Sequence, residues 1–152
     1  MHRVVPSLIP TYVYTLFAAL VVGSIIVAGC TMETSGVKNQ ALNQQLTNID
    51  QYVAAKSLAL INQAVESGQN STEVLGLPVE VSNQIYWVCL LNGESGALVK
   101  SGVGEVAVAT GGGGVAIPAQ VNASGVFVSS SCTAYLQCFV ENQAVVLKLM
   151  GV

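Results

Sequence analysis

Charged residues are scarce in this sequence: they account for 9% of its 152 residues and leave a formal net charge of −3. Soluble domains average about 25% charged residues. A surface with so few charges stays dispersed only when lipid, sugar or identical copies cover much of it. The five basic residues are scattered along the chain. Because nucleic-acid phosphates bind clustered lysine and arginine, this scatter excludes a nucleic-acid-binding patch.

Residues that carry chemistry are also scarce. The only histidine, His2, precedes the longest apolar run and cannot join a Ser–His or Cys–His pair in the later part of the chain. The acidic residues after position 70 are separated in sequence and offer no carboxylate pair for acid–base catalysis. The glycine run at 111–114 is followed by VAIP, with no lysine of a phosphate-binding loop. We therefore predict no enzymatic activity, no metal site and no cofactor.

Four cysteines are present, and their spacing is not that of a zinc site. An extracellular location would permit disulfide bonds. Cys30 ends the apolar run and is expected to be a free, small apolar residue, and Cys138 is expected to be buried in the middle of a strand. The favoured bridge is therefore Cys89–Cys132, with the other pairings among the later cysteines left open.

Two Asn-x-Ser/Thr sequons occur after residue 68, at Asn70 and at Asn122. Both lie in expected connections between elements, where a glycan would be exposed. They are candidate N-glycosylation sites, and attached sugar would help a charge-poor domain to remain soluble.

The longest uncharged run contains no Lys, Arg, Asp or Glu between Arg3 and Glu33. Within it, Leu8 to Cys30 provides the roughly 20 apolar residues that a helix needs to cross a bilayer. Arg3 before the run favours a cytoplasmic N-terminus. The run exceeds the hydrophobic region of a signal peptide, about 7–15 residues, and the helical pattern continues beyond it. We therefore expect the segment to be retained.

A proline-free stretch follows, and its larger apolar residues recur at helical spacing from Leu42 to Leu60. Gly68 is the expected C-terminal stop. The simplest interpretation is one helix over residues 7–67, about 90 Å long. The alternative is an anchor helix, a hinge near Gly36 and a separate helix that packs on the following domain.

After Gly68 the pattern favours short strands. Residues 85–91 alternate between two apolar faces, which is typical of a central strand buried on both sides. A terminal hairpin is expected around Asn142-Gln143, with the apolar residues of 136–140 opposite those of 145–149.

The predicted fold class is therefore α+β. A long N-terminal hydrophobic-to-amphipathic α-helix, residues 1–68, is expected to form the membrane or filament-core part. A compact antiparallel β-sandwich or barrel-like head is expected to follow over residues 69–152 and to lie outside the cell.

Three stretches carry a resemblance to known proteins: SLIPTYVYTLFAALVVGS at 7–24, YVAAKSLALI at 52–61 and LGLPVEVSNQIYWVCL at 75–90. They resemble archaeal type IV pilins and pilin-related filament subunits. The chain departs from that pattern at MHRVVPS, which has no glycine or alanine at the leader boundary. It also lacks the glutamate that bacterial pilins carry near the start of the mature helix.

The resemblance implies a structural subunit of a cell-surface filament, with a precursor pool in the cytoplasmic membrane. Its partners would be identical copies of the chain, an assembly ATPase and a membrane platform. The alternative within the same group is a membrane-anchored accessory or minor pilin, or a stator-like protein, with an external β binding domain.

The resemblance also implies that the helices bundle at a filament axis. Small residues in the apolar run would permit close helix approach, and charge is excluded because a buried unpaired ion costs several kcal/mol. The residues assigned to this assembly helix are Leu8, Tyr12, Tyr14, Leu16, Phe17, Leu20, Val21, Val22, Gly23, Ile25, Ile26, Leu42, Leu46, Ile49, Val53 and Leu60.

Overall fold

A computed structural model describes residues 8–94, 96–104, 106, 114–130, 133–141 and 144–152, with only the backbone described at 8–14 and 27–35. Contacts divide the chain into two compact units, Met1–Gln40 and Ala41–Val152. This division lies well before the predicted boundary at 68/69, because the later part of the helix packs on the strands. Each unit is described by itself.

The helix α1 is assigned over Leu8–Ser67. Gly68 follows it with a φ of 64°, and its N–H donates to the carbonyl of Ala64 at 2.9 Å. A glycine in the left-handed region is the usual way to end an α-helix, since it has no Cβ to clash. The predicted stop at Gly68 is confirmed.

In the described part of the chain, no helical stretch combines the length and the apolar character that crossing a bilayer requires.

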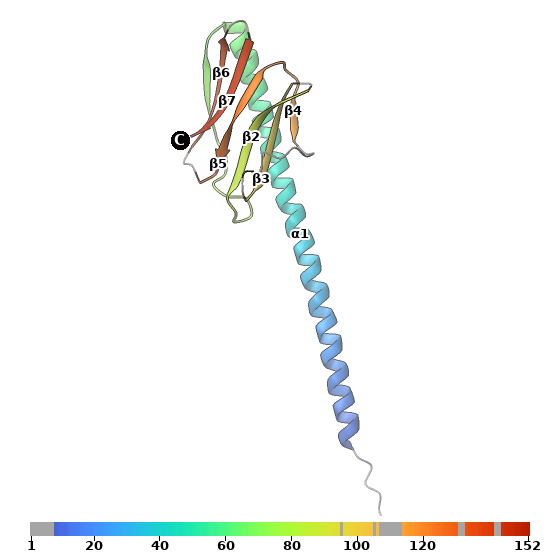
Figure 1. Cartoon of the computed structure of the whole chain (residues 1–152). Helices are drawn as coiled ribbons and strands as arrows, with labels where there is room; N and C mark the ends of the chain where they lie inside the picture. The colour runs from blue at the N-terminus through green and yellow to red at the C-terminus, as the bar shows by residue number, and fades with distance from the viewer. Residues whose placement is uncertain (1–7, 95, 105, 107–113, 131–132, 142–143) are drawn as a thin grey trace, which may run out of the picture. The chain divides into compact units, whose positions relative to one another are not determined.

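The second unit contains one seven-stranded sheet (Figure 1), in the order β1-β6-β7-β5-β2-β3-β4. All neighbouring strands are antiparallel except β5 and β7, which are parallel. The strands are β1 (Ser71–Leu75), β2 (Tyr86–Gly93), β3 (Gly96–Val103), β4 (Val115–Ile117), β5 (Asn122–Val128), β6 (Ala134–Glu141) and β7 (Ala144–Gly151).

The predicted fold class is wrong. The strands form a single mixed sheet, and not the antiparallel sandwich or barrel-like head that the alternation favoured. A sheet must bury its apolar face against a second layer. Here α1 supplies that layer within the second unit, so no second sheet is required. The parallel pair arises because the β6–β7 hairpin inserts between β1 and β5.

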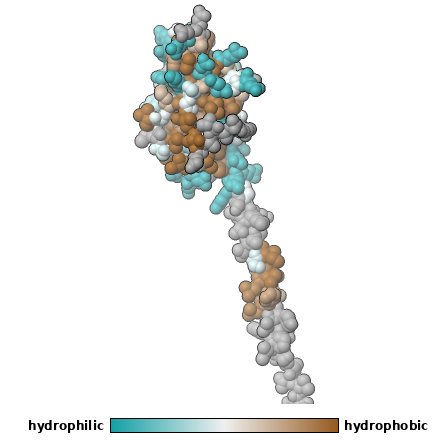
Figure 2. Space-filling view, in the orientation of Figure 1, coloured by the Kyte–Doolittle hydropathy of each residue, from teal (hydrophilic) through white to brown (hydrophobic). Residues whose placement is uncertain are grey.

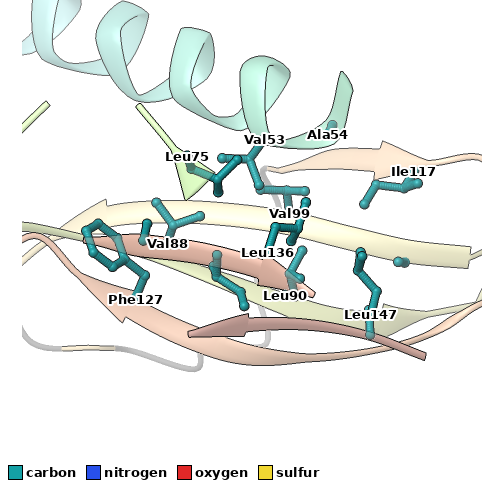
Figure 3. Packing of buried hydrophobic residues seen from close by; sticks show 14 of the residues in the cluster. Val53, Ala54, Leu75, Val88, Leu90, Val99, Ile117, Phe127, Leu136 and Leu147 are labelled. Carbon is teal, nitrogen blue, oxygen red and sulfur yellow. The ribbon is translucent and has the colours of Figure 1, made fainter. Parts of the chain in front are cut away.

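The core lies between α1 and the sheet (Figure 3). Val53 and Ala54 of the helix point toward the strands, where they meet residues such as Val88, Val99 and Leu136. Val53, Val88, Val99 and Leu136 are fully buried. At about 1.5–3 kcal/mol for each buried aliphatic side chain, this interface is the main stabilising contact of the unit.

Two local predictions are confirmed. The strand expected at 85–91 is β2, a central strand that is buried on both faces over its first five residues, as predicted. The terminal hairpin pairs Leu136 with Leu149 and Cys138 with Leu147, as expected. The predicted turn at Asn142-Gln143 lies outside the described residues, and β1 was not anticipated.

Candidate functional site

All side chains of α1 over residues 15–26, called here the apolar segment, are exposed to solvent. Phe17 and Leu20 are 67% and 65% exposed. Figure 2 shows the segment as a hydrophobic band. Free apolar surface of this extent is rare on monomeric proteins and marks a contact site. Its exposed large apolar residues are Leu16, Phe17, Leu20, Val21, Val22, Ile25 and Ile26.

The backbone and polar atoms of the apolar segment are suited to close contact. A Cβ added to Gly23 would meet no atom within 4 Å, so a partner could approach this point. The Ser24 hydroxyl donates to the carbonyl of Val21 at 2.7 Å, so it presents no unsatisfied donor to an apolar partner. Leu8, Tyr12 and Tyr14, also assigned to the assembly helix, have side chains outside those that the structure describes.

The five outer residues assigned to the assembly helix lie elsewhere. Ile49, Val53 and Leu60 are buried, and Leu42 and Leu46 pack against the same core. Their apolar surface is used against the chain's own sheet, so they cannot also meet another copy without unfolding the unit. Among the assigned residues whose side chains the structure describes, only those of the apolar segment remain available for contact with another copy.

One carboxylate is buried in this helix–sheet core. Asp50 is 7% exposed, and its Oδ1 has no hydrogen-bond partner among the described residues. Burial raises its pKa from 3.8 to about 6, and hydrogen bonds with the side chain and backbone of Ser101 oppose that rise. The Ser101 hydroxyl oxygen also lies within hydrogen-bond distance, 3.3 Å, of the carbonyl oxygen of Leu46. The core thus contains a titratable group, Asp50, to which none of the predicted functions assigns a role.

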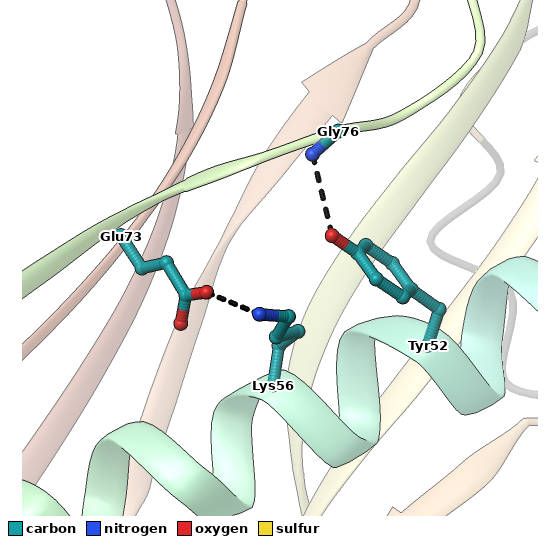
Figure 4. Close-up of polar contacts among 4 residues, drawn as sticks. All are labelled: Tyr52, Lys56, Glu73 and Gly76. Carbon is teal, nitrogen blue, oxygen red and sulfur yellow. Dashed lines mark hydrogen bonds and ion pairs between the residues drawn. The ribbon is translucent and has the colours of Figure 1, made fainter.

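Polar contacts join α1 to β1 and the segment after it (Figure 4). Lys56 forms an ion pair with Glu73, and the hydroxyl of Tyr52 accepts the N–H of Gly76 at 3.4 Å. The hydrogen bond to Glu73 and its charge raise the pKa of Lys56. Because the pair is open to water, it fixes the position of β1 more than it adds stability.

The described cysteines are buried thiols. Cys89 and Cys138 are both inaccessible, and burial raises the pKa of each. A protonated, buried thiol is a poor nucleophile. Cys132, the predicted partner of Cys89, lies outside the described residues, so the Cys89–Cys132 bridge stays a prediction.

Both sequon asparagines are exposed. Asn70 directly precedes β1, and Asn122 is the first residue of β5. Asn122 lies on an open hollow of about 400 Å³ between the β2–β3 hairpin and the start of β5. In that hollow Asn92 Oδ1 accepts the N–H of Ala123 at 2.7 Å. Exposure is compatible with glycosylation at either site, which stays a prediction.

The hollow offers few groups for chemistry. Glu94 is the acidic residue in its lining, and no group of three or more His, Cys, Asp or Glu side chains capable of holding a metal occurs among the residues that the structure describes.

Comparison with protein-family models, with curated proteins and with solved structures found no match to the chain. Function therefore has to be inferred from the chain's own residues and contacts.

Proposed function

We propose that the chain is a structural subunit of an extracellular filament of the archaeal type IV pilus kind. In this proposal the apolar segments of neighbouring copies pack together in the filament, and the sheet units lie outside. The observation that carries it is the exposed, charge-free run of apolar side chains from Leu16 to Ile26.

The physical reason is the removal of apolar surface from water. Burying a Leu, Ile or Phe side chain stabilises an assembly by about 1.5–3 kcal/mol, and several such residues follow one another here. Gly23 and Ser24 among them permit close approach of helices. An identical neighbour offers a matching surface that also carries no charge. The membrane precursor, the assembly ATPase and the platform rest on the resemblance to pilins.

Leu20→Lys is expected to abolish assembly. Each copy would bring an unpaired ammonium into an apolar contact, at a cost of several kcal/mol per subunit. The measurement is the amount of protein in fibres sheared from cells, by electron microscopy and peptide identification. Val37→Lys is the matched control, because Val37 is also 65% exposed on α1 but lies next to Lys38, outside the apolar segment. Fibres should persist in Val37→Lys.

If the chain is instead a membrane-anchored accessory protein, it should stay in the membrane and be absent from fibres. Finding the wild-type chain only in the detergent-soluble membrane fraction, with no fibres containing its peptides, would refute the filament proposal and favour the accessory alternative.

A further inference from the structure

The sheet of the second unit has one face covered by α1. The opposite face, called here the open face, carries exposed or partly exposed side chains on β1, β5, β6 and β7, while Trp87 and Cys89 of β2 are buried. Side chains alternate between the faces along each strand. Leu136, Leu147 and Leu149 belong to the core under α1. Their strand neighbours Tyr135 and Met150 therefore belong to the open face.

An apolar stripe crosses the open face from one strand to the next. Val74 of β1 pairs with Tyr135 of β6, and Tyr135 pairs with Met150 of β7. Val126 of β5 directly follows the last parallel pair, Gly125↔Leu149, and so continues the stripe. Val74, Val126 and Met150 are 57%, 41% and 39% exposed. Hydrophobic residues gather over the sheet on this side in Figure 2.

Charge is distributed unequally between the two sides of the unit. By register the open face carries Lys148 beside the stripe, paired with Gln137, and Lys100 of β3, while its carboxylate, Glu141, is confined to the end of β6. The Lys148 ammonium lies over the Phe139 ring, 5.2 Å from its centroid. The outward side of α1 carries Val65, which is 61% exposed, next to the exposed carboxylate of Glu66. The open face thus presents apolar residues with two lysines, and the last turns of α1 present an apolar residue with an anion.

We infer that the open face of one copy packs against the outward side of α1, at Val65 and Glu66, of a second copy. This inference rests on the proposed function, because it names the contact between sheet units of neighbouring filament subunits. The apolar stripe covers Val65, and Lys148 meets Glu66 of the other copy. Two open faces packed on each other would instead bring together two surfaces that each carry Lys100 and Lys148, which like-charge repulsion disfavours.

The symmetry of this contact suits a filament. Two different surfaces of the same chain meet, so each added copy leaves a free open face at one end and a free helix surface at the other. Such heterologous contacts continue without closing unless a rotation brings the ends together.

A charge-reversal experiment with the full chain tests the inference. Lys148→Glu and Val126→Glu are each expected to raise the critical concentration for fibre formation about tenfold, because a carboxylate then faces Glu66 or enters the apolar contact. The double variant Lys148→Glu with Glu66→Lys restores opposite charges and should return to within about threefold of wild type. Emission from Trp87, the single tryptophan, checks that each variant is folded.

Val79→Glu is the matched control. Val79 is 76% exposed but lies on the connection between β1 and β2. In that connection Ser82 contacts Gln45 of α1, which lies well before Val65 along the helix. It should leave the critical concentration unchanged. If wild type forms fibres and neither Val126→Glu nor Lys148→Glu raises the critical concentration, the inference is overturned and the filament proposal still stands. Failure of the double variant to recover would overturn Glu66 as the acceptor. Absence of wild-type fibres would instead refute the filament proposal itself.

Discussion

Gly125→Ala is expected to destabilise the second unit by about 4 kcal/mol or more, enough to prevent folding. Gly125 has a φ of 123°, where side chains other than hydrogen are strained by about 1–3 kcal/mol. A Cβ at this position would also lie 2.0 Å from the carbonyl oxygen of Leu149 and 2.8 Å from its nitrogen. Backbone atoms of a paired strand cannot move aside as a flexible side chain does. The parallel contact between β5 and β7 would therefore have to open.

The measurement is urea unfolding of the full chain, followed by the emission of Trp87, which is buried beside β5 through its pairing with Val128. Gly104→Ala separates strain from steric overlap. Gly104 also has a positive φ, 85°, but a Cβ there would meet no atom within 4 Å. Its cost should stay near about 1 kcal/mol. Equal losses in the two variants would show that β5 and β7 do not approach as closely as the structure indicates.

Gly125 lies in β5, whose pairing with β7 could not be predicted from the sequence. The β6–β7 hairpin was predictable, because two apolar alternations separated by a short turn pair locally. The pairing of β5 with β7 joins residues far apart in sequence, and nothing in the alternation of either strand states which strand lies beside it. A sandwich and a mixed sheet on a helix therefore give similar local patterns. Glycine at position 125 is compatible with the close pairing of β5 and β7 in the mixed sheet. A single glycine in a strand is also typical of a bulge, so it does not predict that pairing.

The candidate site was predictable to a similar extent. Helical spacing correctly marked Ile49 and Val53 as residues on a buried face, but periodicity does not identify the layer that buries them. The absence of charge between Arg3 and Glu33 identified the apolar segment, because that feature depends on composition alone. The open face could not be found from sequence, since Val126 and Met150 become neighbours only through the β5–β7 pairing.

Asp50→Asn is the second large effect, and it is expected to stabilise the protein at neutral and alkaline pH. The carboxylate is buried between α1 and β3 with one oxygen lacking a partner, and burial disfavours its charged form. Asparagine has nearly the same shape and no charge. Its amide NH₂ can donate to the Ser101 hydroxyl oxygen while its carbonyl accepts from the backbone of Ser101.

The sign of the pH dependence follows from the raised pKa. The folded carboxyl binds its proton with a pKa of about 6, against an ordinary value of 3.8. The stability that the neutral form contributes is therefore complete below pH 3.8 and is lost as the pH rises through about 6. This difference corresponds to roughly 3 kcal/mol. The variant should lack that loss, and should gain about 2 kcal/mol over wild type at pH 8 once changed hydrogen bonding is allowed for.

The decisive quantity is the difference in unfolding free energy between wild type and Asp50→Asn, measured in urea at pH 4, 6 and 8. Other carboxyl groups contribute to both chains and cancel in the difference. Glu66→Gln is the control, because Glu66 is an exposed carboxylate on the same helix and pays no cost of burial, so its difference should stay small throughout. A difference for Asp50→Asn that is equal at pH 4 and pH 8 would mean that the carboxylate remains hydrated in the folded chain. The close packing of α1 on β3 around Ser101 would then be wrong.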